Sequence, residues 1–532
     1  MIRSQRLILA VFVLSVGILS PLSLRANTVY ISQNGGAFSG GLACSGKSTQ
    51  PLSFLQKSSN WVSNSPTGSQ IGPGTTVYLC GTLSSATANT TFATCYQSGT
   101  SGSPITFQAD SNTVITSPAW GIVFSCGSVS YIDFDGDSKQ GVIQNTANGS
   151  SDNYPNQVQT IVFSIGGSSH LTISNWTVSN VYIHDSTSDT TPGNPYPCGV
   201  CDYGSSSYIT LHDNVWHDMN WQNDAIGDHM VEYNDEVYHV NHGIGGGDTG
   251  ATNIWIHDNN YHDFSNWATS SNAYHLDPIH VFANANDGPN GIYMWNNYMH
   301  GDLGANLNAC IYLESNGYNP GVENAYAFNN VCITATVTGP GSGCWGMGDE
   351  NEYHTFFNNT CVVPTSTNYA SWITGGSTYV AENNIFECNG AQCMQVGPQY
   401  ASLSGVSFNY NVWHTTAVQA FCYGLSSEPC YPTFVSYQSG SGQDANSIGV
   451  NPQLNSDGSE TSNSPTIGKG KNLSSLCTGL GISGNPCLSD TSLGNTRTPV
   501  ARPVTAAWDI GAFQSGSASQ VNPPTGLAAV VE

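Results

Sequence analysis

The sequence is poor in positive charge. It holds 10 Lys and Arg against 35 Asp and Glu, a formal charge of −25, and charged residues make up only 8% of its 532 residues. No Lys or Arg occurs between Gln140 and Gly468. Nucleic-acid-binding proteins need a basic surface to neutralise phosphates, so the composition disfavours a nucleic-acid partner and none is expected. Coiled coils and helical bundles are also excluded, because they need Ala, Glu, Lys, Leu and Arg in quantity.

Long apolar runs are missing beyond the first 26 residues, so no later segment is expected to cross a membrane. Residues 1–26 place Arg3 and Arg6 before the apolar run LILAVFVLSVGIL and end in Leu24-Arg25-Ala26, a pattern typical of a secretory signal. An uncleaved membrane anchor is the alternative. We therefore expect a secreted or cell-surface protein, monomeric and without a membrane span after signal removal.

Cysteine is abundant, with 16 residues that all follow the signal segment. An even number in an exported protein predicts disulfides. Cys198-Gly-Val-Cys201 also has the spacing of a zinc ligand pair, and zinc is the alternative there. The short pairs predict closed loops: Cys388/Cys393, Cys422/Cys430 and Cys477/Cys487.

A degenerate repeat organises the chain. Each unit has a short alternating apolar run, an Asn-Asn pair or a relative of it, and a second apolar run. The second residues of these pairs are Asn175, Asn214, Glu236, Asn260, Asn297, Asn330, Asn359, Asn384 and Asn411. Such units are too short to bury their own apolar face, so they must stack. A β-propeller is the competing repeat, but it expects a steadier period of ~40–45 residues.

Asn at a repeated corner suits a left-handed turn, and its amide can hydrogen-bond to the next Asn in the stack. These motifs resemble the right-handed parallel β-helix proteins of the pectin-lyase-like superfamily over most of residues 27–514. The resemblance implies an all-β, single-stranded solenoid. It also implies an N-terminal capping helix in residues 52–62 and terminal strands at 464–470 and 508–513. Residues 515–532 read as a linker that resembles the start of a truncated fibronectin-type module.

Two Cys pairs occupy equivalent places in adjacent coils. Cys332 and Cys361 each follow an Asn by two residues, and Cys310 and Cys344 each precede an apolar anchor. Stacked Cα atoms lie ~4.8 Å apart, which falls inside the disulfide window of ~4.4–6.8 Å. We therefore predict Cys332–Cys361 and Cys310–Cys344 bridges.

A further strand precedes each Asn strand between residues 225 and 349. We align these strands on inward anchors: Ile226, Ile244, Ile279, Ile311 and Trp345. Their outward neighbours are then Gly227, Gly245, His280, Tyr312 and Gly346. Glycines beside His280 and Tyr312 predict a groove in which a substrate approaches the backbone.

Two acidic columns flank this face in the alignment. The upstream column holds Asp224, His242 and Asp277, and the downstream column holds Asp228, Asp248, Glu314 and Asp349. Successive coils lie ~4.8 Å apart and alternate ones ~9.6 Å. Glycosidases hold two carboxyl groups roughly 5–5.5 Å apart for retention or ~6.5–9.5 Å for inversion, so the stack can supply either. Crowding also raises one pKa, which makes a general acid.

Ordinary interpretations stand beside this one. Single acids at β-helix corners are usually solvated turn residues, and clustered carboxylates also suit a structural Ca²⁺ site. His242 and His280 fit a structural stack. Trp267 and Tyr274, in the 262–290 insertion, are candidates for stacking on sugar rings.

A fainter likeness connects residues 223–243 with polygalacturonase-type glycoside hydrolases. Asn223-Asp224 is similar to their Asp-Asp pair, and Asn241-His242-Gly243 to their Gly-His-Gly. The resemblance gives Asp224 an acid or base role and His242 a supporting one. Their Asn-Thr-Asp motif would fall near Cys198, where no Asp matches, and their Arg-x-Lys is absent, which argues against galacturonan.

The sequence thus leaves three hypotheses. The first is a secreted glycoside hydrolase acting on a neutral or weakly charged polysaccharide, needing no cofactor. Its acid and base come from Asp224, Asp248 and Asp277, or from Glu314 and Asp349, with His242, His280, Tyr312 and Asp228 near the substrate. The second is a non-catalytic glycan-binding or adhesin β-helix. The third is a Ca²⁺-assisted lyase, in which the metal replaces the basic residues that β-helix lyases use.

Overall fold

The computed structural model describes residues 27–515 except 86–89, 117–119, 146–159, 182–197, 203–204, 225, 265–274, 305, 336–341, 349–352, 364–368, 374–377, 391, 398–402 and 426–428. The expected signal (1–26) and all but the first residue of the expected linker (515–532) lie outside the described residues. So do Trp267, Tyr274 and Asp349. None of the helices in the described part of the chain is long and apolar enough to span a bilayer.

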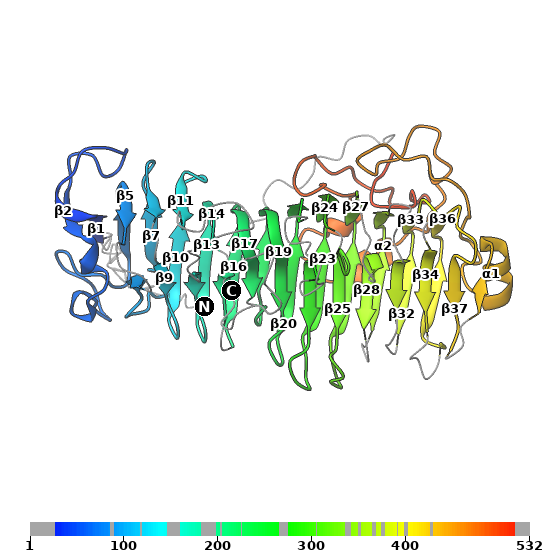
Figure 1. The fold of residues 1–532 in the computed structure, drawn as a ribbon, viewed down its shortest axis with the longest axis horizontal. Coiled ribbons are helices and arrows are strands. Elements are labelled where there is room, and N and C mark those ends of the chain that lie inside the picture. The colour runs from blue at the N-terminus through cyan, green and yellow to red at the C-terminus, as the bar shows by residue number, and fades with distance from the viewer. Residues whose placement is uncertain are drawn as a thin grey trace, which may run out of the picture.

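The chain winds into an elongated stack of coils, seen side-on in Figure 1. Most coils contribute three short strands, and each strand pairs in parallel with the equivalent strands of the next coils. The first face consists of β1 (Asn27–Ser32), β4 (Thr75–Leu79), β7 (Ile105–Ala109), β10 (Ser130–Asp135), β13 (Ser169–Ser174), β16 (Ser207–His212), β18 (Val231–Tyr233), β20 (Thr252–His257), β23 (Asn290–Trp295), β26 (Glu323–Phe328), β29 (His354–Phe357), β32 (Tyr379–Glu382) and β35 (Val406–Asn409), with β2 (Asn34–Ala37) and β3 (Ser48–Pro51) at its edge.

The second face follows the Asn corner. It consists of β5 (Thr82–Ser84), β8 (Val114–Thr116), β11 (Gly141–Gln144), β14 (Trp176–Ser179), the first parts of β17 (Val215–Asp224) and β19 (Glu236–Gly246), β21 (Asn260–His262), β24 (Tyr298–Gly301), β27 (Val331–Thr334), β30 (Thr360–Val362), β33 (Ile385–Glu387) and β36 (Val412–His414).

The third face carries the outward glycines. It consists of β6 (Thr90–Thr94), β9 (Trp120–Ser125), β12 (Ile161–Ser164), β15 (Cys198–Cys201), the later parts of β17 and β19, β22 (Asp277–Phe282), β25 (Ile311–Glu314), β28 (Ser342–Gly348), β31 (Tyr369–Ile373), β34 (Gln392–Val396) and β37 (Phe421–Tyr423), with β38 (Cys430–Tyr431) antiparallel to β37. The predicted parallel β-helix is therefore confirmed.

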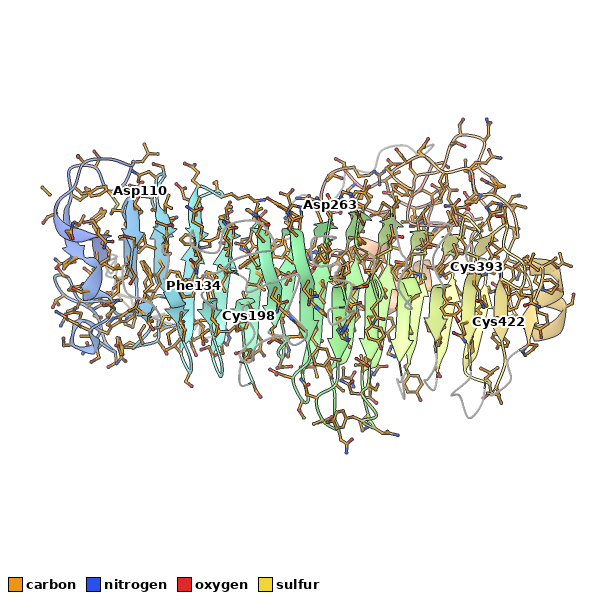
Figure 2. The ribbon with its side chains drawn as sticks, in the orientation of Figure 1. Asp110, Phe134, Cys198, Asp263, Cys393 and Cys422 are labelled. Carbon is orange, nitrogen blue, oxygen red and sulfur yellow. A yellow bond between two sulfur atoms is a disulfide. The ribbon has the colours of Figure 1, made fainter. Side chains whose placement is uncertain are left out.

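Apolar side chains from all three faces fill the interior. Phe107 stacks on Phe134 with ring centroids 5.3 Å apart, and Phe124 on Phe163 at 5.2 Å. Phe134 is labelled in the N-terminal part of the stack in Figure 2. Stacking like on like is what lets units that cannot fold alone share one continuous core.

The ends of the stack are closed differently from the prediction. Residues 52–62 form two 3₁₀ turns, η1 (Leu52–Phe54) and η2 (Ser58–Asn60), instead of a capping helix. The Ser-Ser-Asn composition of η2 is poor for an α-helix, and Trp61 instead forms a β-bridge with Ile71. At the other end, α1 (Phe434–Ser441) packs Tyr437 against Phe421, with ring centroids 5.4 Å apart.

The segment after α1 does not add the predicted terminal strands. Gly470 and Trp508 pair through one antiparallel bridge. The strap, residues 468–515, runs back along the outside of the stack, where it is coloured orange to red in Figure 1. Its short helices α2 (Ser474–Gly479) and η4 (Pro486–Leu488) lie in one apolar cluster with Trp295, Phe328 and Phe357 of the first face.

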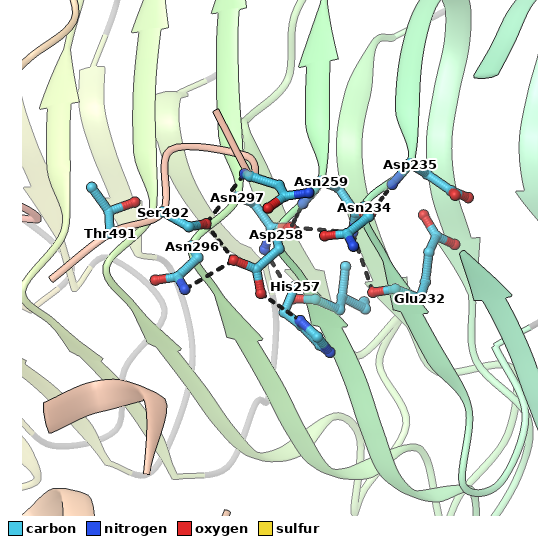
Figure 3. A network of polar contacts seen from close by, with 12 residues as sticks. Glu232, Asn234, Asp235, His257, Asp258, Asn259, Asn296, Asn297, Thr491 and Ser492 are labelled. Carbon is cyan, nitrogen blue, oxygen red and sulfur yellow. Dashed lines mark hydrogen bonds and ion pairs between the residues drawn. The ribbon is translucent and has the colours of Figure 1, made fainter. Parts of the chain in front are cut away.

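A buried amide ladder fixes the corner between the first and second faces. Its members are Asn214, Asp235, Asn259, Asn297, Asn330, Asn359, Asn384 and Asn411. Asn330 Nδ2 donates to Asn359 Oδ1 at 3.0 Å, and the Asn330 backbone N–H donates to the same oxygen at 2.9 Å. Figure 3 shows the stretch from Asp235 to Asn297.

The left-handed turn and the ladder use different residues. The residue before each ladder member has positive φ, as at Asp213 (57°), Asn234 (59°) and Asn296 (57°). The predicted alignment is therefore wrong at Asn175, which is a turn residue with φ 63°, and at Glu236 and Asn260, which follow the ladder by one residue. Two adjacent polar residues at each corner made the sequence register ambiguous.

Eight disulfides close within the described residues, namely Cys44–Cys80, Cys95–Cys126, Cys198–Cys201, Cys310–Cys332, Cys344–Cys361, Cys388–Cys393, Cys422–Cys430 and Cys477–Cys487. The short loops are confirmed, and Cys198 pairs with Cys201 as a disulfide. Cys198, Cys393 and Cys422 are labelled in Figure 2.

The predicted Cys332–Cys361 and Cys310–Cys344 bridges are wrong. Cys332 does stack on Cys361 in register, but its sulfur bonds to Cys310, with the Cα atoms 6.4 Å apart. Cys344 bonds to Cys361 in the same way at 6.0 Å. Side chains of stacked residues run parallel to one another, whereas inward side chains of the second and third faces point towards each other, so the bridges cross the interior.

The amide ladder generates a stability prediction. Asn359→Ala should lower the free energy of unfolding by about 3 kcal/mol, because it leaves buried donors and acceptors of the two neighbouring coils unpaired, at Ala327, Asn330 and Asn384. Denaturant titration followed by circular dichroism measures the loss. Asn34→Ala, on the exposed edge strand β2, is the control and should stay within about 0.5 kcal/mol of the native chain. Equal effects of the two substitutions would contradict a role for the ladder.

Candidate active site

The third face brings together most of the predicted anchors. Ile244 pairs with Ile279, Ile279 with Ile311, and Ile311 with Trp345. Gly245, His280, Tyr312 and Gly346 are register neighbours on the same strands, as predicted. The site thus lies on successive parallel strands of the third face.

The alignment is wrong at Ile226, because Asn223 is the residue that pairs with Ile244. β17 passes from the second face to the third without a break, so it reaches the site three residues earlier than expected. An apolar pattern could not reveal this, since the inward residue is polar. Asn223 is buried and donates to the Glu232 carboxylate at 3.0 Å.

Trp221 consequently takes the place expected for Asp224. Trp221 pairs with His242, and the two rings stack with centroids 4.0 Å apart and planes within 5°. The Trp221 ring also covers Gly245, where a Cβ would lie 2.3 Å from Trp221 Cζ3. Gly245 must therefore be glycine, which explains part of the predicted glycine floor.

Three carboxyl groups on neighbouring coils form an acid cluster: Asp202, Asp224 and Asp248. Asp224 follows Asn223 on β17 and lies close to Gly246. A Cβ atom added to this glycine would be 3.4 Å from Asp224 Oδ1. Asp248 lies over Gly227 in the same way, at 3.5 Å. All three residues are half-buried, so each is partly open to solvent, although Asp248 Oδ2 is itself buried.

The acid cluster shifts the pKa values of its members. Burial, with repulsion from Asp202 and Asp248, raises the pKa of Asp224 to about 7. Burial and the charge of Asp202 raise the pKa of Asp248 to about 6, against a hydrogen bond from the Ser206 backbone. The sequence did not identify Asp202, although its place directly after Cys201, the register partner of Asp224, carried the signal.

A second group, the histidine cluster, comprises His242, His275, Asp277 and His280. His242 pairs with Asp277 in register, as predicted. The four side chains each offer one metal-ligating atom, and these atoms all lie within 4.8 Å of one another. Asp277 is fully buried. A carboxylate enclosed in this way is out of reach of a glycosidic oxygen, which removes Asp277 from the candidates for direct acid catalysis.

β25 borders the histidine cluster. Glu314 Oε2 accepts a hydrogen bond from His280 Nε2 at 3.2 Å. Burial favours a higher pKa for Glu314, but this bond and the charge of His280 outweigh it, and the pKa is lowered. Tyr312 is buried beside His280, with ring centroids 4.7 Å apart.

The predicted downstream column does not form. Glu314 pairs with Phe282 and Gly348, one register position before the one that Asp248 continues. Asp228 lies at a first-face corner, where it accepts hydrogen bonds from the Thr252 backbone at 2.8 Å and hydroxyl at 2.7 Å. Asp228 is thus a turn residue, not a groove residue. The loops between strands differ in length, which breaks the spacing on which the column was based.

Comparison with known proteins finds only distant structural similarity. No family model and no curated protein matches the chain. Similar solved structures include pectate lyase Pel9A, 14% identical with a TM-score of 0.39, the alignment covering 92% of this chain and 96% of that one. The A-module of the Azotobacter vinelandii mannuronan C-5 epimerase AlgE4 is 13% identical, with a TM-score of 0.34 and coverages of 66% and 87%.

An endo-xylogalacturonan hydrolase from Aspergillus tubingensis is 11% identical, with a TM-score of 0.24 and coverages of 73% and 90%. TM-scores this low carry no argument about the site. The architecture rests on the strand pairings of the chain itself, and these make it a parallel β-helix, as its repeats predict.

Proposed function

We propose that the protein is a polysaccharide-degrading glycoside hydrolase that uses the acid cluster. The observation that carries the proposal is the carboxyl group of Asp224, with a pKa of about 7, beside Asp202 and Asp248. Glycoside hydrolysis needs one carboxylic acid to protonate the leaving oxygen. It also needs one carboxylate to attack the sugar or to activate water. Environments that push the two pKa values apart assign these roles.

Asp224 is the general acid in this proposal. At neutral pH about half of it is protonated, whereas Asp248, with a pKa of about 6, is mostly ionised. Asp248 is therefore the nucleophile or base. Asp202 contributes charge that raises the pKa of both partners.

The third face around the acid cluster suits a sugar chain. Trp221 is half-buried and lies three residues before Asp224 on β17, so it offers an aromatic platform beside the acid. Tyr312 and Glu314 continue the same face two coils on. The excess of acid and the lack of Lys and Arg between Gln140 and Gly468 would repel a polyuronate, which favours a neutral or weakly charged glycan.

Substitution of the acid cluster tests the reaction. Asp224→Asn and Asp248→Asn should each lower kcat about 10²-fold or more, the usual size of a general acid or base contribution. The assay presents the full secreted chain with neutral and uronic polysaccharides and records new reducing ends together with ultraviolet absorbance. Hydrolysis yields reducing ends without absorbance.

Asp213→Asn is the matched control, because Asp213 is a first-face turn residue at a corner where Asn234 and Asn296 stand in other coils. It should keep full activity. Unsaturated, absorbing products that a chelator abolishes would instead indicate the Ca²⁺-assisted lyase. Retention on an insoluble glycan without turnover, unchanged in both acid-to-amide variants, would indicate a binding protein.

The proposed roles predict a pH profile. Activity should rise as the pH passes about 6, where Asp248 loses its proton, and fall beyond about 7, where Asp224 loses its own. Initial rates between pH 4 and 9 on a hydrolysed substrate measure the profile. A rate that still increases above pH 8 would contradict Asp224 as the acid.

The raised pKa of Asp224 also predicts a stability effect. Because folding raises this pKa from 3.8 to about 7, the ionised form destabilises the fold, and stability falls as the pH rises through that window. Asp224→Asn removes the penalty and should stabilise the chain by roughly 1–3 kcal/mol at pH 8, but little at pH 4. Thermal unfolding of both chains at the two pH values measures the difference. A destabilised variant at pH 8 would contradict the shift.

A further inference from the structure

The histidine cluster has the geometry of a metal centre. Asp277 Oδ2 lies 3.4 Å from His242 Nε2, 3.4 Å from His275 Nε2 and 3.6 Å from His280 Nδ1. His242 Nε2 and His280 Nδ1 are 3.4 Å apart. A tetrahedral ion bound at ~2.0–2.1 Å holds its ligand atoms about 3.3 Å from one another. The four spacings, 3.4–3.6 Å, are close to that figure.

Hydrogen bonds at the far side of each ligand fix which atom faces the centre. His242 Nδ1 donates to Asn241 Oδ1 at 2.5 Å, and Asn241 Nδ2 donates to the His275 carbonyl at 3.0 Å, which sets the orientation of the amide. His242 Nε2 therefore carries a lone pair. His280 Nε2 donates to Glu314, which leaves a lone pair on His280 Nδ1 as well.

Asp277 is oriented in the same manner. Its Oδ1 accepts the Ala309 backbone N–H at 3.0 Å, while Oδ2 is buried and accepts no hydrogen bond from the described residues. Three lone pairs thus meet within 3.6 Å in a place that is closed to water on the Asp277 side. Such an arrangement is repulsive unless a metal ion or a shared proton lies between them.

We propose that His242, His275, Asp277 and His280 bind one divalent transition-metal ion of the zinc class. Three imidazole nitrogens and one carboxylate oxygen form a donor set for zinc-like ions, whereas Ca²⁺ and Mg²⁺ prefer six or more oxygens. Asn241 and Glu314 are positioning residues that hold the imidazoles, the usual outer partners of metal-bound histidine.

The centre lies beside the acid cluster without sharing a residue with it. The Trp221 ring stacks on the outer face of the ligand His242. His275 is the exposed ligand, with 52% of its side chain accessible, so it marks the side from which an ion enters. The ion would also supply the positive charge that the surrounding sequence lacks, next to the carboxylates of Asp277 and Glu314.

Zinc and cobalt binding to the full, untagged secreted chain tests the inference. The chelator-stripped protein should take up one equivalent of Zn²⁺, measured by elemental analysis after dialysis, and Zn²⁺ should raise its Tm. One equivalent of Co²⁺ should give the intense visible bands of a tetrahedral site. None of these measurements needs a substrate, so their outcome does not depend on whether the proposed hydrolase activity is found.

Variants assign the uptake to the cluster. His275→Ala removes the exposed ligand with little risk to folding, and it should abolish the cobalt bands and the Tm response. Glu314→Gln should weaken Zn²⁺ binding by about 10- to 100-fold while one equivalent still binds at excess metal. His212→Ala, at a first-face corner beside Asp213, is the control and should bind as the native chain does.

Three results would overturn the inference. The first is no uptake by the stripped native chain. The second is equal uptake and equal cobalt spectra in the native chain and in His275→Ala. The third is a Tm that responds to Ca²⁺ but not to Zn²⁺, which would place a hard-cation site elsewhere.

Discussion

The register between neighbouring coils depends on one buried row of amides. From Asn297 to Asn384, each ladder side chain accepts a backbone N–H and an amide hydrogen of the previous coil and donates to a carbonyl and to the next ladder oxygen, as Asn359 does with Asn330, Ala327 and Asn384. A shift of one residue would leave these groups unpaired inside the protein. The ladder therefore fixes the strands of all three faces, and with them the distances between functional side chains.

One coil shows how the ladder tolerates charge. Asp235 replaces Asn in the row and accepts from Asn214 and from Trp216 Nε1. Glu232 lies in the interior, three residues before Asp235. Its carboxylate accepts hydrogen bonds from the Tyr261 hydroxyl at 3.0 Å and from the Asn223 side-chain amide at 3.0 Å. Burial raises the pKa of both acids, and each also raises the pKa of groups around it. The interior of this coil thus supports Asn223, the polar residue that occupies the place of the expected apolar anchor and brings Asp224 to the third face.

The sequence predicted the architecture well because the architecture is periodic. Alternating apolar runs and Asn corners recur in nearly every coil, and the anchors from Ile244 to Trp345 follow from them. The site was predicted less well because it lies where the period breaks. β17 and β19 run through a corner without a turn, loops of unequal length separate Asp248 from Glu314, and polar Asn223 faces inward.

The missed residues differ in how far the sequence could have shown them. His275 had a usable signal, its two-residue spacing from Asp277 on an extended segment. Trp221 and Asp202 could be found only once the strand register was known. The disulfides show the same limit of sequence-based prediction. The stacking of Cys332 on Cys361 was predicted correctly, but the direction in which their side chains point was not.

The strap changes how a stack of this kind comes apart. A solenoid whose coils touch only their neighbours frays from its ends, one coil at a time. Here Arg502 donates to Asn329, the Lys471 N–H donates to Asn383, and Ser492 bonds to Asp258, so one segment is tied to turns spread over several coils. Coils near the C-terminal end cannot peel away singly while the strap holds them. Mechanical pulling from that end should accordingly meet one large cooperative rupture where an unstrapped solenoid would give a series of small steps.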